Sequence, residues 1–402
     1  MRKFLLLFLG FCSMTLSSAL HAEEQGRLQE SAGDSLSVSL LTCSPGEEIY
    51  QYYGHTALLV REVNTGNAIV FNYGLFDFNT PFFMWRFLLG QTDYLCGACY
   101  LDDFLASYRR RGTEVREVGL NLTQEECARL YASLKENCRP ENATYRYNFF
   151  YDNCATRVRD QIKKCLKERT CFIGGRNKKS LRQIVHEFSA EYKWSLFGQD
   201  LLLGAEADKP ATPEIQEFAP MYLEEDIKAS YVCDSVGHVR PLVSGTRILV
   251  SDEGVEVQKG FPLSPFAVSI ILLIITIALS GWDIYRRRPA WAFDAAVLIV
   301  RGLAGALVTF MFFFSVHPTV DSNWQILLLN PLPLLFLYWV VRNGRRNERC
   351  LYHEMERIYL IVVVCVMKFI PQYISSEVYI LALCLWIRSM SNHIIYTYRL
   401  RK

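Results

Sequence analysis

The sequence has almost no excess of charge, because 43 Lys and Arg stand against 41 Asp and Glu, for a formal net charge of +2 over 402 residues. A near-neutral chain lacks the basic excess that is typical of nucleic-acid binding, so no nucleic-acid partner is expected. Internal repeats and low-complexity tracts are also missing from the soluble part of the sequence. These absences leave a globular or membrane protein as the class to consider.

Clusters of metal-ligating residues are missing as well. The chain has only seven histidines, and His186, His238 and His353 stand apart from other ligand-type residues. Cys96 and Cys99 form a CxxC motif, but no second CxxC and no nearby histidine accompany it. Because a zinc site needs about four such ligands, we expect neither a metal nor a cofactor.

Cysteine, in contrast, is plentiful before the apolar C-terminal part. If Cys154 is set aside as a candidate nucleophile, an even number remains, enough for up to about four disulfides. Such use of cysteine is typical of an exported, oxidising compartment. The pairs that lie close in the sequence are Cys165 with Cys171 and Cys127 with Cys138.

Composition divides the chain into three parts. Residues 1–22 read as a secretory signal peptide, with Arg2 and Lys3 before an apolar run and small residues at its end. Residues 23–262 are charged and rich in turn residues, and they are long enough for one sizeable core. Residues 263–402 consist mainly of long apolar runs, which predict a transmembrane domain.

Five spans fit these runs, at 266–285, 291–316, 325–341, 357–375 and 377–394. The loops 317–323 and 375–377 hold no Lys or Arg, whereas basic residues follow the first, third and fifth spans. The positive-inside rule then places the C-terminus in the cytoplasm and the soluble domain outside. The signal peptide requires the same orientation independently.

Charged residues inside these spans are candidates for functional sites. Asp294 and Arg301 lie seven residues apart on one helix face and are placed to pair with each other. Lys368 and Arg388 could reach the interface or face the bundle interior. For all of them we favour a role in packing and orientation.

Short apolar runs predict a hairpin that begins with a histidine. Residues 55–60 and 68–73 read as strands joined by a turn at 64–67, and 35–42 and 114–120 read as further strands. Thr123 is placed to begin a helix, with acidic residues in its first turn. The expected fold class of the soluble domain is therefore α+β.

A cysteine lies far downstream at the start of another predicted helix. Asp152 and Asn153 are strong N-cap types before a helical pattern over 155–168, so Cys154 lies next to the first helical residue. The helix N-terminus and a nearby His55 imidazole would lower the thiol pKa, and backbone N–H groups would face an oxyanion. The alternative is that Cys154 belongs to a disulfide and His55 is a core histidine.

A third group should orient the imidazole. If the hairpin is centred on 65–66, Asn72 pairs with Leu59 and shares the face of His55. That register leaves Asn72 several residues from His55, so a bulge or a different turn would be needed. Asn72 is nevertheless the candidate orienter, and the competing candidates are Tyr52, Tyr151 and Asp152.

The order of these motifs, histidine first and cysteine second, resembles the circularly permuted branch of the papain-like fold, as in NlpC-type proteins and lecithin:retinol acyltransferase. More closely, the set resembles the Lnb family of bacterial lipoprotein N-acyltransferases. The matching stretches are 53–58 (YGHTAL), 71–78 (FNYGLFDF), 151–160 (YDNCATRVRD), 197–204 (FGQDLLLG), Asp208, Pro210 and 218–220 (FAP). The resemblance implies a circularly permuted papain-like periplasmic domain followed by a five-helix bundle in the bacterial inner membrane.

The resemblance also implies a reaction. Cys154, with His55 as its base, would take an acyl chain from a phospholipid as a thioester and pass it to the α-amine of a diacylglyceryl-cysteine lipoprotein. Phospholipid, lipoproteins and the membrane are the implied partners. Two alternatives stay open, a membrane-tethered cysteine peptidase or cell-wall amidase and a non-catalytic envelope assembly module. The five spans favour the acyltransferase, because one anchor would suffice for a peptidase.

An aromatic segment follows the hairpin. Residues 80–89 (TPFFMWRFLL) read as a helix or another amphipathic segment. Their aromatic and aliphatic side chains could enter the outer leaflet or line an acyl tunnel. A plain core segment is the favoured interpretation.

Overall fold

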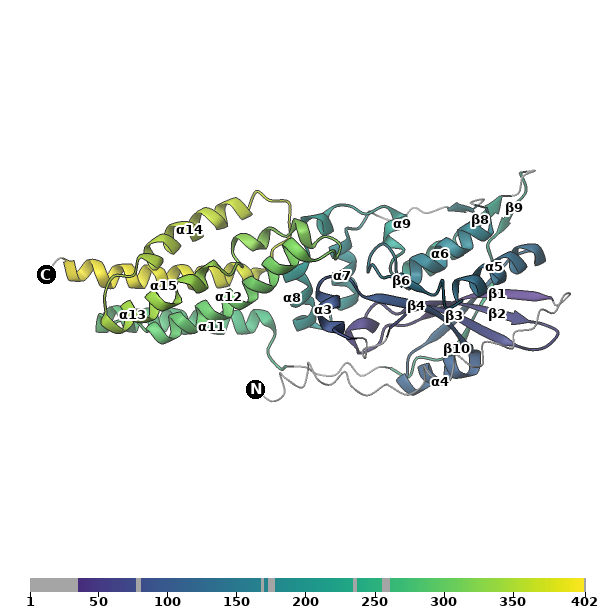
Figure 1. The fold of residues 1–402 in the computed structure, drawn as a ribbon, viewed down its shortest axis with the longest axis horizontal. Coiled ribbons are helices and arrows are strands. Elements are labelled where there is room, and N and C mark those ends of the chain that lie inside the picture. Colours follow the sequence, from purple (N-terminus) through teal and green to yellow (C-terminus); the bar gives the residue numbers. More distant parts are fainter. Residues whose placement is uncertain are drawn as a thin grey trace.

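The chain forms a mixed α/β domain followed by a bundle of apolar helices, and the two lie end to end along the longest axis (Figure 1). The structure is a computed structural model that describes residues 35–76, 81–167, 170–172, 178–233, 237–254 and 261–400. The predicted signal peptide, 1–22, lies outside the described residues.

The domain is built on a seven-stranded sheet in the order β10-β5-β1-β2-β3-β4-β6. Neighbouring strands are antiparallel throughout. The strands are β1 (Leu36–Cys43), β2 (His55–Glu62), β3 (Ala68–Leu75), β4 (Asp93–Tyr100), β5 (Val115–Leu120), β6 (Thr144–Arg146) and β10 (Val243–Val250). The predicted histidine hairpin, β2 and β3, therefore lies in the interior of the sheet. A small second sheet contains β7 (Thr170–Phe172), β8 (Ser230–Cys233) and β9 (Val239–Pro241).

Helices cover both faces of the large sheet. Helix α4 (Leu101–Arg111) packs on one face, where Phe104 and Leu105 meet Leu59 of β2. Helices α5 (Gln124–Asn137) and α6 (Cys154–Cys165) pack on the other, where Leu130 and Val158 join Leu58. Because side chains alternate along a strand, β2 supplies both cores, and each large apolar side chain buried there contributes roughly 1.5–3 kcal/mol.

Both helices on the second face begin where the capping signals predict. The Thr123 hydroxyl accepts a hydrogen bond from Glu126 N, and the Glu126 carboxylate accepts one from Thr123 N, which completes a capping box. Asn153 and Thr156 form the equivalent box at α6. Such caps stabilise a helix by about 1 kcal/mol and fix its first residue.

The predicted pairing of Cys127 with Cys138 is wrong. The two residues lie near opposite ends of α5, about 16 Å apart along a helix that rises 1.5 Å per residue, too far for a disulfide. Instead, Cys138 Sγ lies 2.7 Å from Cys96 Sγ of β4. The side chain of Cys171 lies outside the described residues, so its pairing with Cys165 stays a prediction.

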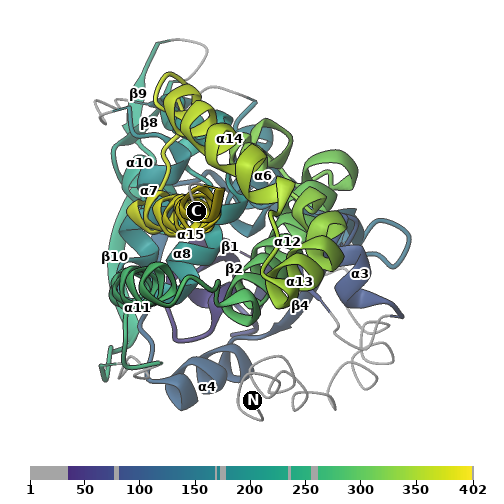
Figure 2. The ribbon, with the colours of Figure 1, turned by 90° about the vertical axis from the view of Figure 1, so that its left-hand side faces the viewer.

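The C-terminal part contains the helices α11 (Pro265–Arg286), α12 (Trp291–Phe314), α13 (Leu337–Arg346), α14 (Leu351–Met367) and α15 (Ser376–Leu400). Viewed along the bundle, α15 lies between α11 and α14 (Figure 2). Within the described residues, four helical segments are long and apolar enough to cross a membrane: Pro265–Arg286, Trp291–Phe314, Trp324–Arg346 and Ser376–Tyr398. Helix α14 has 17 residues and ends before position 375, so the count of five spans stays a prediction.

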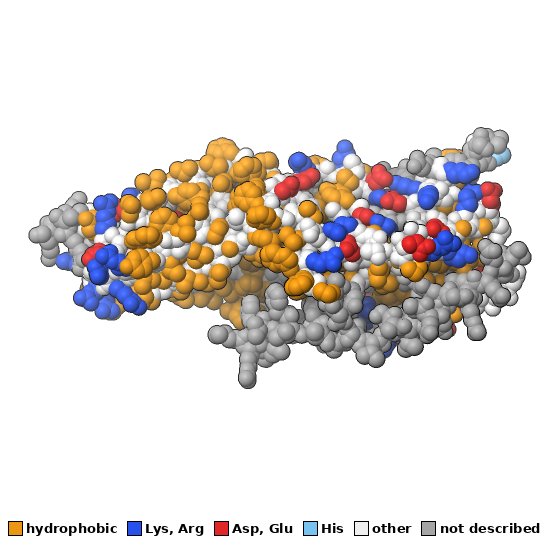
Figure 3. Space-filling model, viewed as in Figure 1, with side chains coloured by type: hydrophobic (Ala, Val, Ile, Leu, Met, Phe, Trp, Pro, Cys, Tyr) orange, Lys and Arg blue, Asp and Glu red, His pale blue; other side chains and the backbone are white. Residues whose placement is uncertain are grey.

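Buried charges in the bundle are paired between helices. Arg388 Nε donates to Asp294 Oδ1 at 2.6 Å and Nη2 donates to Asp283 Oδ2 at 2.7 Å. Arg301 forms an ion pair with Glu356 of α14. The predicted Asp294–Arg301 pair is therefore wrong, because other helices supply the partners. Figure 3 shows a wide apolar band over the bundle, with Lys and Arg gathered at the end far from the α/β domain.

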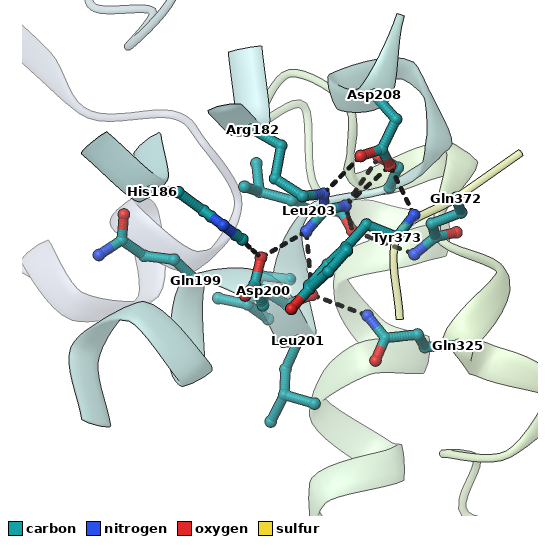
Figure 4. A network of polar contacts seen from close by, with 12 residues as sticks. Arg182, His186, Gln199, Asp200, Leu201, Leu203, Asp208, Gln325, Gln372 and Tyr373 are labelled. Atoms are coloured by element: carbon teal, nitrogen blue, oxygen red, sulfur yellow. Dashed lines mark hydrogen bonds and ion pairs between the residues drawn. The ribbon is translucent and has the colours of Figure 1, made fainter. Parts of the chain in front are cut away.

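A polar network joins the domain to the bundle at α7 (Leu181–Ser189) and α8 (Lys193–Leu202) (Figure 4). The buried Arg182 donates to Asp200 Oδ1 at 2.7 Å and to Asp208 Oδ1 at 2.8 Å. His186 Nε2 lies 2.9 Å from the same Asp200 oxygen.

Residues of the bundle complete this network. Gln325 Nε2 donates to the Asp200 carbonyl at 2.7 Å, and the Tyr373 N–H donates to Asp208 Oδ2 at 3.0 Å. Gln372 Nε2 donates to the Leu203 carbonyl at 3.2 Å. The stretch 197–204 therefore lies at the junction of the two parts and sets how the domain is seated on the bundle.

Candidate active site

His55, Asn72 and Cys154 lie together at one end of the large sheet. His55 is the first residue of β2, Asn72 lies in β3, and Cys154 is the first residue of α6. Val158 and Ile162 of α6 pack in the core shared with β2 and β3, which holds the N-terminus of the helix at this position. The site is thus assembled from a strand pair and a helix far apart in sequence.

The imidazole of His55 is hydrogen-bonded to the thiol of Cys154. Burial raises the pKa of Cys154, but the charge of His55 and the hydrogen bond to it outweigh burial and lower the pKa below its ordinary value. Burial likewise lowers the pKa of His55, but the charge of Cys154 and the hydrogen bonds with Cys154 and Asn72 together outweigh burial and raise that pKa. Opposite shifts of two facing groups favour a thiolate–imidazolium pair.

Other buried thiols of the domain shift in the opposite direction. Burial raises the pKa of Cys43 to about 12, although Cys43 lies directly opposite His55 in the β1–β2 register. Burial also raises the pKa values of Cys127 and Cys165 to about 11. A position opposite the histidine strand is therefore not enough to lower the pKa of a thiol. Cys154 differs from Cys43 because its side chain is hydrogen-bonded to the His55 ring.

Asn72 contacts the same histidine. Asn72 Oδ1 lies 3.2 Å from His55 Nε2. The predicted register was wrong, because Asn72 pairs with Ala57 and not with Leu59. This difference leaves Asn72 on the predicted face and brings it two residues closer to His55. Since Nε2 faces Asn72, the other ring nitrogen, Nδ1, is left for the thiol.

The N-terminus of α6 places polar groups around the Cys154 thiol. The backbone N–H groups of Thr56 and Ala155 also hydrogen-bond to the Cys154 sulfur and lower its pKa. Asn153 Oδ1 accepts hydrogen bonds from Ala155 N at 3.0 Å and Thr156 N at 2.9 Å. The Cys154 N–H belongs to the first helical turn, whose donors have no partner within the helix. It is available to an oxyanion on a substrate bonded to the sulfur.

The three competing orienters make contacts elsewhere. The Tyr52 ring stacks on Tyr192 at 3.8 Å between centroids, and Tyr151 is exposed. Asp152 accepts two hydrogen bonds from Arg157, at 2.6 and 2.8 Å. Of the four candidates, Asn72 is the one that the structure places in hydrogen-bonding contact with His55.

A tyrosine that no sequence signal indicated lies beside Cys154. Within the described residues, the buried hydroxyl of Tyr145 has no hydrogen-bond partner. A methyl group added to Gly74 would lie 3.7 Å from Cys154 Cβ and 3.9 Å from Tyr145 Oη, so all three surround one small space. Gly74 has a φ of 89°, a left-handed conformation that side chains disfavour, which keeps this space open. No local pattern marks Tyr145, because β6 has only three residues.

The site holds no cluster that indicates a metal. Within the described part of the chain, no group of three or more His, Cys, Asp or Glu side chains could hold a metal ion. The polar groups around Cys154 instead fit acyl-transfer chemistry, which needs a nucleophile, a base and donors for an oxyanion.

Two family models match this chain. The model of the Lnb N-terminal periplasmic domain matches residues 23–170, and the model of the Lnb transmembrane domain matches residues 256–399. His55, Asn72, Tyr145 and Cys154 all lie within the first match. Neither the curated proteins nor the solved structures that were searched contain a match.

Proposed function

We propose that this chain, which belongs to the Lnb family, is a membrane-bound lipoprotein N-acyltransferase that works through an acyl-thioester on Cys154. Membership of the family makes the chain a multi-pass membrane protein with a periplasmic N-terminal domain. The observation that carries the proposed chemistry is the hydrogen bond between Cys154 and His55. Asn72 contacts the His55 ring at Nε2 and orients it.

In the first half-reaction, the Cys154 thiolate attacks the carbonyl carbon of a phospholipid acyl ester. A carbon–sulfur bond forms and the carbonyl becomes a tetrahedral oxyanion. The His55 imidazolium then gives its proton to the departing glycerol oxygen as the carbon–oxygen bond breaks. The products are a lysophospholipid and an acyl-thioester on Cys154, and His55 is left neutral.

In the second half-reaction, the α-amine of a diacylglyceryl-cysteine lipoprotein attacks the thioester carbonyl. Neutral His55 accepts the proton that the amine must lose, and the carbon–sulfur bond breaks. The amide product is an N-acylated lipoprotein. The cycle ends with the same thiolate–imidazolium pair with which it began.

The oxyanion formed in each half-reaction needs hydrogen-bond donors. The Cys154 N–H is one, and the Tyr145 hydroxyl is the second, because it is buried beside Cys154 and has no hydrogen-bond partner among the residues that the structure describes. The Arg157 guanidinium lies 3.6 Å over the Tyr145 ring and holds the ring in place. Donors that are already in position avoid the cost of reorganisation in the transition state.

The orientation proposed for the chain places the domain in the periplasm, the bundle in the inner membrane and the C-terminus in the cytoplasm. The Lys and Arg side chains at the far end of the bundle support this arrangement (Figure 3). In that orientation the catalytic domain meets the outer leaflet of the inner membrane, where a phospholipid donor and a lipid-anchored acceptor can both be reached.

The test is mass spectrometry of lipoprotein N-terminal peptides from cells that depend on this chain. Cys154→Ala should leave the diacylglyceryl group but remove the amide-linked chain. Cys127→Ala is the matched control, because it also removes a buried thiol on a helix of the same core, and it should retain N-acylation. Unchanged N-acylation in a well-expressed Cys154→Ala protein would overturn the proposal and direct attention to peptidase activity.

A further inference from the structure

Helix α3 (Phe83–Leu88) and its N-cap residue Phe82 expose several large apolar side chains. The exposed fractions are 83% for Phe82, 50% for Met84, 54% for Trp85 and 42% for Phe87. Phe82 also adopts a left-handed φ of 58°, which costs about 1–2 kcal/mol for a residue with a side chain. The interpretation of this segment as a plain core segment is therefore wrong. A contiguous exposed apolar surface of this kind marks a binding surface.

This helix is attached to the transmembrane bundle. The Trp85 ring lies 5.0 Å from the Phe310 ring of α12, between centroids. Val316 N donates to the Leu89 carbonyl at 2.9 Å, and His317 Nε2 donates to the Phe87 carbonyl at 2.6 Å. These contacts place α3 at the end of α12 nearest to the domain (Figure 1). The apolar band of the bundle reaches the same end of the domain (Figure 3).

A positively charged rim borders α3. Arg86 Nη2 donates to Asp93 Oδ2 at 2.5 Å, and Arg146 Nε donates to Asp93 Oδ1 at 2.8 Å. Two guanidinium groups thus share one carboxylate, which leaves one excess positive charge. All three side chains are partly exposed to solvent, so the guanidinium groups can accept a further anion. Arg is well suited to a phosphate, because its planar fork can donate two hydrogen bonds to it.

The rim opens into a cavity of about 180 Å³. Its lining includes Phe76 and Thr144 together with Arg86 and Asp93. The Phe76 ring lies 5.1 Å from Tyr94, and Tyr94 stacks on Tyr147 at 4.1 Å. A methyl group on Gly74 would lie 3.7 Å from both Tyr147 Cε2 and Cys154 Cβ. A continuous aromatic wall therefore connects the cavity with Cys154.

We propose that α3 and the Arg86–Asp93–Arg146 rim form the docking surface for a glycerophospholipid of the outer leaflet. The exposed side chains of α3 lie among its acyl chains, and the two arginines bind its phosphate. The aromatic wall guides the acyl ester towards Cys154, and this last step rests on the proposed function. Continuity with the transmembrane bundle favours lipid as the occupant, because α3 contacts the end of α12, a helix long and apolar enough to cross a membrane.

The first test is photo-crosslinking in the full-length Cys154→Ala protein in phospholipid nanodiscs, so that its outcome does not depend on turnover. Benzoylphenylalanine at Phe82 should give a phospholipid adduct by mass spectrometry. The control site is Tyr100, which is also an exposed aromatic residue but lies at the opposite end of β4 from Asp93. No lipid adduct at Phe82, equal adducts at both sites, or an adduct to another protein chain would each overturn the docking surface.

The second test addresses the phosphate. Arg86→Gln with Arg146→Gln should raise the KM for the phospholipid donor by about tenfold and leave kcat close to that of the unaltered protein. Arg110→Gln, which removes an exposed arginine of α4, should leave both constants unchanged. An unchanged KM in the double variant would remove the phosphate assignment.

The two proposals can fail separately. If Cys154→Ala abolishes N-acylation but Phe82 gives no lipid adduct, the proposed reaction is supported and the proposed docking surface is wrong. If Phe82 gives the adduct but Cys154→Ala cells still N-acylate lipoproteins, the surface binds lipid for some other purpose.

Discussion

His55 Nε2 and Asn72 Oδ1 lie 3.2 Å apart, although 17 positions separate the two residues in the chain. The antiparallel pairing of β2 with β3 produces this contact, since Asn72 lies opposite Ala57 and on the face of His55. An amide oxygen at this distance accepts a hydrogen bond from the Nε2–H of the ring. It thereby selects the tautomer and orientation in which the other nitrogen faces Cys154.

Asn72 should set the upper pH limit of the first half-reaction. The hydrogen bond that the His55 ring donates to Asn72 Oδ1 helps to raise the pKa of His55, so Asn72→Ala should lower that pKa. The reactive pair exists above the pKa of Cys154 and below that of His55. The alkaline limb of the pH profile should therefore move to lower pH, as measured by single-turnover formation of the acyl-enzyme.

Two variants control this experiment. Asn72→Asp adds a negative charge beside the imidazolium and should move the alkaline limb to higher pH. Asn67→Ala, in the exposed turn of the same hairpin, should leave the profile unchanged. If Asn72→Ala and Asn72→Asp moved the limb in the same direction, Asn72 would not act through the charge of His55.

Tyr145→Phe should lower kcat by roughly a hundredfold to a thousandfold, because removal of one oxyanion donor typically has that effect. Since the Tyr145 hydroxyl has no partner in the described part of the protein, its removal breaks no hydrogen bond and should not lower thermal stability. Tyr131→Phe, which removes a hydroxyl that donates to Glu62, should lower stability slightly and preserve kcat. A loss of stability with unchanged kcat in Tyr145→Phe would assign the hydroxyl a structural role.

Cys96 and Cys138 should form a disulfide in the periplasm, because the two thiols are adjacent and the compartment is oxidising. The bridge would close a loop of 42 residues and stabilise the domain by about 4 kcal/mol on the chain-entropy account. Mass spectrometry of non-reduced peptides should find the two cysteines linked, and Cys96→Ser should lower the melting temperature. A peptide that links Cys138 to any other cysteine would contradict the assignment.

Arg388→Leu should destabilise the bundle by about 3–5 kcal/mol, because it leaves two buried carboxylates without their partner. Those carboxylates belong to Asp283 and Asp294. Thermal unfolding in detergent would measure the loss, with the partly exposed Arg342→Leu as the control. Adding Asp283→Asn and Asp294→Asn should recover much of the stability. If they did not, the cost would lie in packing and not in charge.

Local signals in the sequence predicted several parts of the site well. The capping residues Asn153 and Thr123 placed the starts of two helices, because a cap acts through hydrogen bonds to residues two or three positions away. The alternation of apolar residues placed β2 and β3, and with them His55. The predicted register of this hairpin was wrong, because the exact turn geometry decides which residues face each other.

Partners that come from distant segments could not be predicted in the same way. Asp294 and Arg301 share a helix, yet each pairs with a different helix, because three-dimensional packing brings closer partners. The apolar residues of α3 are equally consistent with a core segment and with a membrane contact. Periodicity shows which face of a helix is apolar, but it does not show whether protein or lipid covers that face.

The sequence alone thus determined an exported α/β domain followed by long apolar helices. It also determined that His55 begins a strand and that Cys154 begins a helix. The length of an apolar run, a helix cap and the alternation of apolar residues each depend only on nearby residues. They therefore predict a helix or a strand whatever the rest of the chain does. The tertiary structure decided that Cys154 contacts His55 and that α3 lies against the membrane bundle. It also decided that the Tyr145 hydroxyl lies beside Cys154 with no partner in the described part of the chain. Those relationships depend on how the sheet, α6 and the bundle pack together, which no single segment specifies.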